Sequence, residues 1–260
     1  MTSWEDLDEE LGRWREAGAE ATLWWRDDDA SKPTPALDRL LAISGGHGVA
    51  CALAVVPHRA TPELAKTVNA VPTIYPVQHG YRHINHAPSG EKAAEFGNHR
   101  DRGEIELELG MGWRELAHFR RLAPVFVPPW NRMSDDFNSC LATLGIKGVS
   151  QHSPRRAETA RAGLCQVNTH VDIINWRTTR GFVGTAKALD YMVSHLQGRR
   201  RREVDADEPT GVLTHHLAHD EAAWQFMDDL LRWTLGKSNV RWLTPFEAFK
   251  IEPREPELDT

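Results

Sequence analysis

The chain has 260 residues, is 40% hydrophobic, and carries 31 Lys and Arg against 37 Asp and Glu, a net charge of −6. This size and apolar content suit one domain with a sizeable core, and the acidic balance argues against nucleic acid as a partner. Three widely spaced cysteines predict no disulfide framework, and no apolar run approaches the roughly 18 residues of a membrane span.

The first residues, 1–20, predict a helical extension. They are acidic and amphipathic, and they lack the basic and apolar regions of a signal peptide. We therefore expect a soluble, cytoplasmic protein without a membrane span. The whole chain, 1–260, is expected to form a single domain, with its core at 20–250.

From residue 21 onward, strand-like and helix-like segments alternate. Strands are expected at 21–28, 49–57, 71–80, 124–131, 146–152, 165–176 and 210–216, and helices at 34–48, 61–70, 105–122, 134–145, 184–198 and 220–236. The segment 49–57 is apolar throughout, as in a strand buried on both faces. About seven βα repeats of this kind predict a parallel sheet, open or closed into a barrel.

Unusual polar side chains gather where these strands end. The first strand ends in three consecutive aspartates, 27–29, and the third in "HGYRH", with His79 and His83. The last predicted strand ends in His215 and His216. Because the carboxyl ends of parallel strands form the active face of such folds, these side chains are expected to lie close together.

One carboxylate and two imidazoles are the ligands of an open catalytic metal site. His79 and His83 are four residues apart, so on a nascent helix both rings face one way and share one cation. A second aspartate of the run can take a proton from water, and His215 can protonate a leaving group. A divalent metal is therefore expected, Zn²⁺ first, with Co²⁺, Ni²⁺ or Fe²⁺ as alternatives.

These residues, in this order, resemble the polysaccharide deacetylases, the metal-dependent carbohydrate esterases that include chitin and peptidoglycan deacetylases. "RDDDA" stands where that family has TFDDG, and "HGYRH" where it has H(S/T)xxH. "VPPWN" stands for RxPxG, "DIINW" for DxxxW, and "LTH" for LxH.

The resemblance implies an α/β fold, a distorted (β/α)7 barrel, and removal of an N- or O-linked acetyl group from a sugar or related small amide. It assigns the metal to Asp29, His79 and His83, the base to Asp28 and the acid to His215. His216 is the alternative acid, and Asp27 with Asp28 is the alternative pair of base and ligand. Asp172 is expected to orient the acid.

Five further side chains are expected to contact the substrate: Trp130 and Trp176, whose rings suit a sugar face, with Tyr81, Asn131 and Arg132. The third motif departs from the family pattern, because Val127 replaces its leading Arg and Asn131 its Gly. We expect Arg26 or Arg132 to hold the base in place of the missing Arg.

Two rival hypotheses remain. A catalytically silent, carbohydrate-binding member is compatible with the altered third motif. A non-haem iron oxygenase also uses two His and one carboxylate, but the candidate ligands here show no HxD spacing and the helices alternate with strands.

Overall fold

The computed structural model describes residues 1–252. Its strands are β1 (Ala21–Ala30), β2 (Cys51–Val55), β3 (Ile74–His79), β4 (Val125–Val127), β5 (Gly148–Val149), β6 (Thr159–Arg161), β7 (Leu164–Gln166), β8 (Val171–Asp172), β9 (Thr210–Thr214) and β10 (Val240–Trp242). Its helices are α1 (Trp4–Glu16), α2 (Pro35–His47), α3 (Pro62–Asn69), α4 (Arg102–Glu115), α5 (Asn138–Thr143), α6 (Thr185–Arg201), α7 (Glu221–Leu235) and α8 (Pro245–Ala248).

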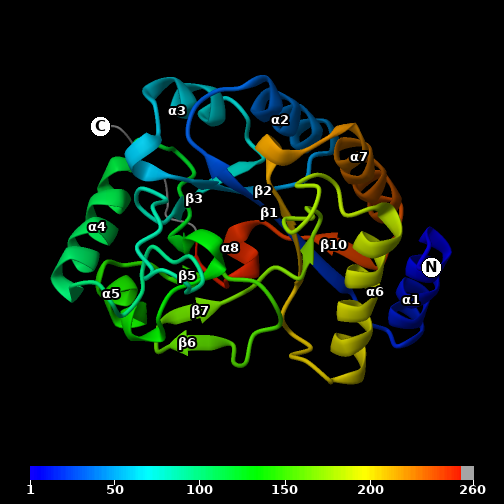
Figure 1. Ribbon diagram of the computed structural model, residues 1–260. Helices are drawn as coiled ribbons and strands as arrows, with labels where there is room; N and C mark the ends of the chain where they lie inside the picture. The colour runs from blue at the N-terminus through cyan, green and yellow to red at the C-terminus, as the bar shows by residue number, and fades with distance from the viewer. Residues whose placement is uncertain (253–260) are drawn as a thin grey trace.

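The strands form one curled sheet, inside an arc of helices (Figure 1). Its order is β6-β7-β5-β4-β3-β2-β1-β9-β8, with β10 beside β1, and among the strand pairs of residues 1–252 only β6–β7 is antiparallel. The sheet ends at β6 on one side and at β8 on the other, so the barrel is distorted and incompletely closed. The predicted (β/α)7 architecture is confirmed. The segment 165–176, expected as one strand, instead spans this opening as two short ones.

Side-chain caps begin most of the helices. Ser3, Thr34, Thr61, Asp101, Asp220 and Thr244 each accept a hydrogen bond from a backbone N–H of the first turn. Asp101 explains why α4 starts earlier than expected, and the helix then gives way to turns after Glu115. Within residues 1–252, none of the helices combines the length and apolar character that crossing a membrane demands.

The two faces of β1 meet different surroundings. Trp24 lies in the interior cluster, edge-on to Phe249, which follows α8. Figure 1 shows α8 inside the arc of strands and helices. Trp25 belongs to the layer between sheet and outer helices, and its indole N–H donates to Thr214 Oγ1 at 2.8 Å. Since side chains alternate along a strand, Arg26 points inward like Trp24.

Candidate metal centre

The aspartate run of β1 is divided by a β-bulge. The parallel pairing of β1 with β2 is regular up to Asp27 and resumes at Ala30 after a register shift. Asp29, inside the bulge, has φ 77°. Bulges re-aim side chains at the rims of barrels, and this one gives the three carboxylates three different surroundings.

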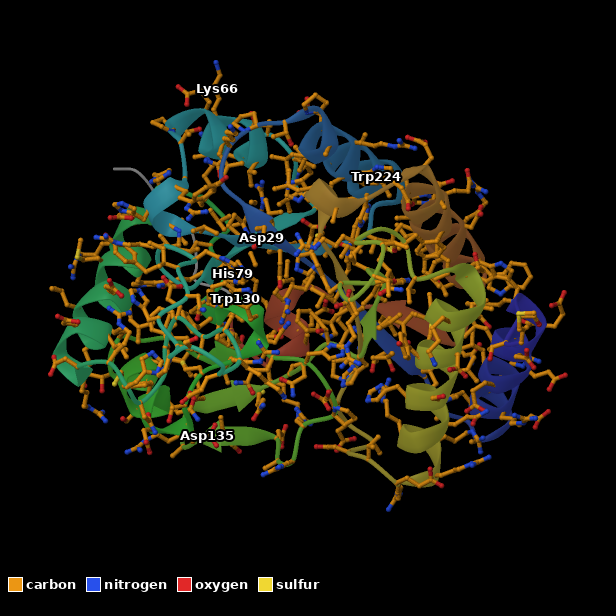
Figure 2. All side chains as sticks on the ribbon, in the orientation of Figure 1. Asp29, Lys66, His79, Trp130, Asp135 and Trp224 are labelled. Carbon is orange, nitrogen blue, oxygen red and sulfur yellow. The ribbon has the colours of Figure 1, made fainter. Side chains whose placement is uncertain are left out.

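Asp29 meets both histidines that the sequence analysis assigned to the metal. Its Oδ1 lies 3.2 Å from His79 Nε2 and 3.3 Å from His83 Nε2. Figure 2 shows Asp29 and His79 together inside the ring of helices. These three side chains form a group that could hold a metal ion.

The tautomer of His79 suits a metal ligand. Its Nδ1 lies 3.0 Å from the carbonyl oxygen of Val127 and donates a proton to it, so the lone pair of the neutral ring is on Nε2, toward Asp29. When His79 is protonated on both nitrogens, it hydrogen-bonds Asp29 through Nε2, and this bond and the charge outweigh burial and hold the pKa of the Asp29 carboxyl well below its usual range. Burial, then the His79 charge, lowers the pKa of His83. The donor set therefore offers a carboxylate and imidazole nitrogens.

The turn between the two histidines is not helical, so the geometry we assumed for them was wrong. Gly80 and His83 have φ 57° and 56°. The buried carboxylate of Glu95 shapes this turn by accepting hydrogen bonds from the N–H groups of Tyr81, at 3.2 Å, and Arg82, at 2.7 Å. A Cβ on Gly80 would lie 2.2 Å from Glu95 Oε2, so glycine leaves the space that this carboxylate occupies.

Glu95 was missed by the sequence analysis. Only one local signal pointed to it, the glycine at the position where the family motif has Ser or Thr. The partner lies 15 residues along the chain, in a polar segment without periodicity. No spacing rule connects the two.

Asp28 is held by Arg26 from its own strand. Arg26 Nε lies 2.9 Å from Asp28 Oδ1, and Nη2 lies 3.0 Å from Oδ2. Both side chains are almost completely buried. Ser150 Oγ accepts from Nη1 at 2.7 Å, and Asn131 Oδ1 accepts from Nη2, which also donates to Asp28, at 2.6 Å. Asn131 was expected to contact the substrate, but its side-chain carbonyl oxygen accepts a hydrogen bond from Arg26.

Arg26 is therefore the arginine that pairs with Asp28, as we expected of one of the two candidates to replace the missing Arg of the third motif. Arg132, the other candidate, is exposed and donates to the carbonyl of Ala93 at 3.1 Å. Val127 at the motif's leading position has no polar group to offer. Both members of the ion pair instead lie on β1, where Arg26 and Asp28 are two residues apart and on the same face of the strand.

Asp27 faces the opposite side of the sheet, where both of its carboxylate oxygens accept hydrogen bonds. Its Oδ1 accepts from His216 Nδ1 at 2.5 Å, and its Oδ2 accepts from Thr214 Oγ1 at 2.6 Å and the His216 N–H at 2.9 Å. Burial would raise the pKa of Asp27, but His216 holds it below the usual value. Asp27 and His216 are thus an ion pair that ties β1 to the turn after β9. Neither is directed at Asp29.

His215 lies on the inner side, with its Nε2 3.9 Å from Asp28 Oδ2. Its ring meets Trp176 edge-on at 4.6 Å, and its Nδ1 is buried without a hydrogen-bond partner among residues 1–252. Asp172 accepts from Trp176 Nε1 at 2.9 Å and from the Ile174 N–H at 3.0 Å. Asp172 was expected to orient His215, and the two residues are connected through Trp176, whose indole N–H donates to Asp172 and whose ring contacts His215.

The aromatic residues expected at the substrate differ in their exposure. Trp176 is 43% exposed, and Trp130, half-buried at φ 55°, lies 4.4 Å from the His83 ring. Trp130 thus borders the metal-ligand group, whereas Trp176 borders His215. Tyr81 is only 1% exposed and packs in the cluster under α4, with its hydroxyl 3.2 Å from Glu115. The expected substrate contact at Tyr81 is therefore wrong, because the residue after the Gly80 turn points into the core.

A second group of potential ligands lies at the opposite ends of the strands. His170, His195 and Glu208 have ligand atoms within 4.8 Å of one another. His170 Nδ1, however, accepts from the Gly211 N–H at 3.0 Å, so the neutral ring carries its proton on Nε2, which faces Glu208 at 3.3 Å. The two imidazoles also stack at 3.4 Å, nearly parallel, so their in-plane lone pairs do not converge. This chemistry disfavours a metal there.

A large hollow of about 1220 Å³ also lies away from the metal-ligand group. It is lined by Tyr75, Lys147 and the residues around Phe249, beside the amino ends of β3 and β5. Its size therefore gives no reason to place the chemistry there.

Comparisons with known proteins identify this architecture. No protein-family model and no curated protein sequence matches the chain. Among solved structures, a proposed polysaccharide deacetylase from Mycobacterium smegmatis superposes with a TM-score of 0.64 at 17% identity, over 93% of this chain and 96% of that one. The chain has the polysaccharide deacetylase fold.

Other structures with the polysaccharide deacetylase fold differ in activity. A peptidoglycan N-acetylglucosamine deacetylase matches with a TM-score of 0.58 at 13% identity, over 94% of this chain and 99% of that one. A CE4 family pseudoenzyme from Bacillus anthracis matches with a TM-score of 0.57 at 14% identity, over 88% and 66%. Such low identity establishes the fold alone. Non-haem iron oxygenases with two His and one carboxylate usually have a double-stranded β-helix, and the fold of this chain is different.

Proposed function

We propose that this protein is a metal-dependent hydrolase that removes an acetyl group, N- or O-linked, from a sugar or related small amide. One observation carries the proposal: Asp29, His79 and His83 converge through their ligand atoms beside a second, arginine-held carboxylate. A divalent cation on these ligands, Zn²⁺ first, would lower the pKa of water and polarise the acetyl carbonyl.

Two side chains carry out the two proton transfers of the reaction. Asp28 accepts the proton of the attacking water, and the Arg26 fork holds both carboxylate oxygens in place while it does so. His215, on the other wall, donates a proton from Nε2 to the departing nitrogen or oxygen. Trp176 fixes the plane of that imidazole, and Asp172 fixes the indole.

The geometry also supports the register that we preferred in the aspartate run. Both oxygens of Asp27 are hydrogen-bonded on the outer face, whereas Asp28 and Asp29 border the histidines. His216 is tied to Asp27 in the same way, which leaves His215 as the better acid. We therefore retain Asp28 as base, Asp29 as ligand and His215 as acid.

Asp28→Asn tests this proposal directly. The variant should bind metal as the wild type does, because the ligands are intact, and lose about 10²-fold or more in kcat, as expected when a general base is removed. Metal content and hydrolysis of acetylated sugars and acetate esters are measured together, with His79→Ala/His83→Ala as the metal-free control. Full activity in Asp28→Asn would contradict the assignment of the base.

A carbohydrate-binding protein without catalysis is the second candidate. It is favoured by the unpartnered Nδ1 of His215 and by the presence of a pseudoenzyme among proteins of this fold. Sugar binding by a metal-loaded wild type that hydrolyses none of the acetylated compounds would select it.

A further inference from the structure

Four loops that follow the carboxyl ends of strands contain bases and no acids. The loops are 31–34, 56–61, 128–134 and 173–184. Together they hold five Lys or Arg and no Asp or Glu, although acids outnumber bases in the whole chain, 37 to 31. The bases are Lys32, Arg59, Arg132, Arg177 and Arg180. We call these loops the basic rim.

Several loops of the basic rim contact the metal-ligand group or its supports. Trp130 and Trp176, one in each of two loops, lie against the rings of His83 and His215. In a third loop, the backbone N–H of His58 donates to the carbonyl of Tyr81, in the turn between His79 and His83, at 3.0 Å.

The bases of the basic rim are free to meet a ligand. All five are exposed, and none of them forms an ion pair with a carboxylate within residues 1–252. Arginines elsewhere on the surface commonly have an acid partner, as Arg39 has Glu221 and Arg241 has Glu20.

The other loops on this edge do not cancel the charge. In 150–158, Arg155 is paired with Asp205, and the one acid, Glu158, is paired with Lys250. The segment 80–101 has three bases and three acids, but Glu95 is buried on backbone N–H groups and Asp101 caps α4. Asp220, in the turn after β9, caps α7. Inside the site, Arg26 compensates Asp28, and a bound cation would compensate Asp29.

We propose that the acetylated substrate is an anion: a sugar carrying a phosphate or pyrophosphate group, which the basic rim attracts and binds while the acetyl group lies at the metal. This rests on the proposed function. Arginine suits phosphate because its planar fork donates two parallel hydrogen bonds. Bases on four separate loops suit a group with two or more charges, and the acidic remainder of the chain opposes wrapping by a long polyanion.

The first experiment compares substrates that differ in charge. N-acetylglucosamine, its 1-phosphate, its UDP derivative and a hyaluronan disaccharide are supplied to the zinc-loaded wild type. We expect kcat/KM for the two phosphorylated sugars to exceed that for the neutral sugar at least about tenfold at low ionic strength, and this excess to shrink as salt screens the rim. Equal values, or an excess that salt leaves unchanged, would overturn the proposal. Preference for the hyaluronan disaccharide would show that the basic rim selects a carboxylate and not a phosphate, against the proposal.

The second experiment locates the charge. Arg177→Gln/Arg180→Gln should lower the ratio of kcat/KM for the 1-phosphate to that for the neutral sugar about two- to tenfold, as expected for two solvent-screened charges. Lys66→Gln is the matched control, since Lys66 is an exposed base without an ion pair in residues 1–252, on α3, far from Asp29 in Figure 2. A ratio that the rim variant leaves unchanged means that phosphate binds the metal directly, against the proposal.

Calorimetry separates this inference from the proposed function. If no acetylated compound is hydrolysed, the hydrolase proposal fails by itself. Titration of the wild type with N-acetylglucosamine 1-phosphate then still decides the charge of the ligand. Salt-dependent binding that Arg177→Gln/Arg180→Gln weakens and Lys66→Gln does not would support the basic rim, and absence of binding would contradict it.

Discussion

Three adjacent aspartates have three different partners, and that division defines the site at the scale of single residues. Asp27 is bound to His216, Asp28 to Arg26, and Asp29 faces His79 and His83. Without partners, three neighbouring carboxylates would repel one another, and burial would increase the cost. The alternation of the strand and the bulge at Asp29 separate them.

The pair of Arg26 and Asp28 should respond strongly to a change in either partner. Arg26→Gln leaves a buried carboxylate without its cation, and we expect a loss of about 3–5 kcal/mol in the free energy of unfolding together with loss of turnover. Urea unfolding and a hydrolysis assay measure the two effects. Arg26→Lys keeps the charge but not the fork. Equal activity in Arg26→Lys and the wild type would show that bidentate geometry is unimportant.

Glu95 should act on the metal without contacting it. Glu95→Ala removes the acceptor for two backbone N–H groups in the turn between the histidines, so we expect the affinity for Zn²⁺ to fall about 10- to 100-fold, as for other residues that orient ligands. Competition with a chelating dye measures it. Glu95→Gln, which retains one carbonyl oxygen, should lie between the two. An unchanged affinity in Glu95→Ala would show that the turn keeps its shape unaided.

At the scale of elements, the strands and the turns after them are connected by buried polar pairs at both ends of the sheet. At the carboxyl ends, Asp27 ties β1 to the turn after β9. At the amino ends, His195 on α6 stacks on His170 and hydrogen-bonds Thr210 at 2.9 Å. The first pair is ionic. The second is built from neutral rings, and this difference predicts a response to pH.

Burial, then the charges of His170 and Arg199, lowers the pKa of His195 to about 2. The unfolded chain binds a proton at this residue below about pH 6.5 and the folded protein does not, so stability is lost as pH falls, by about 1.4 kcal/mol per pH unit. Burial raises the pKa of Glu208 to about 7, so the folded protein binds a proton there before the unfolded chain does. This raises the free energy of unfolding as pH falls, opposite to the effect of His195.

His195→Gln should therefore reduce the acid-induced loss of stability. Glu208 is present in both proteins, so the difference between the two slopes reports on residue 195, provided that Glu208 titrates alike in both. We expect the variant to lose roughly 2 kcal/mol less than the wild type between about pH 6.5 and 5, measured by urea unfolding at each pH. His118→Gln, at an exposed position, is the matched control. Parallel slopes would mean that His195 takes up its proton in the folded protein.

At the scale of the whole molecule, the metal-ligand group joins two strands that the chain places 50 residues apart. Asp29 comes from β1, and His79 and His83 come from the end of β3, with β2 between them in the sheet. An ion bound by all three would stabilise the folded state only, because the unfolded chain does not hold them together.

Zinc should accordingly raise the thermal stability. At a free zinc concentration 100 times Kd the gain is about 2.7 kcal/mol, roughly 5–10 °C in Tm for a chain of this size. Calorimetric scans of chelator-treated protein with and without added zinc measure it. His79→Ala/His83→Ala should show no such shift. A shift of the same size in that variant would place the binding elsewhere in the molecule.

Local patterns were sufficient to predict the alternating elements, the parallel sheet and the polar side chains at the strand ends, because these depend on the period of apolar residues and on what strands carry at their ends. The split of 165–176, the burial of Tyr81 and the choice of Arg26 over Arg132 as the partner of Asp28 could not be predicted in this way. Each is decided by neighbours far along the chain: the sheet order separates β7 from β8, the cluster under α4 takes up Tyr81, and Ser150 with Asn131 holds Arg26. Sequence alone determined which chemical groups are available; the tertiary structure decided which of them meet, because register, bulge and burial are set by contacts between segments that no local spacing connects.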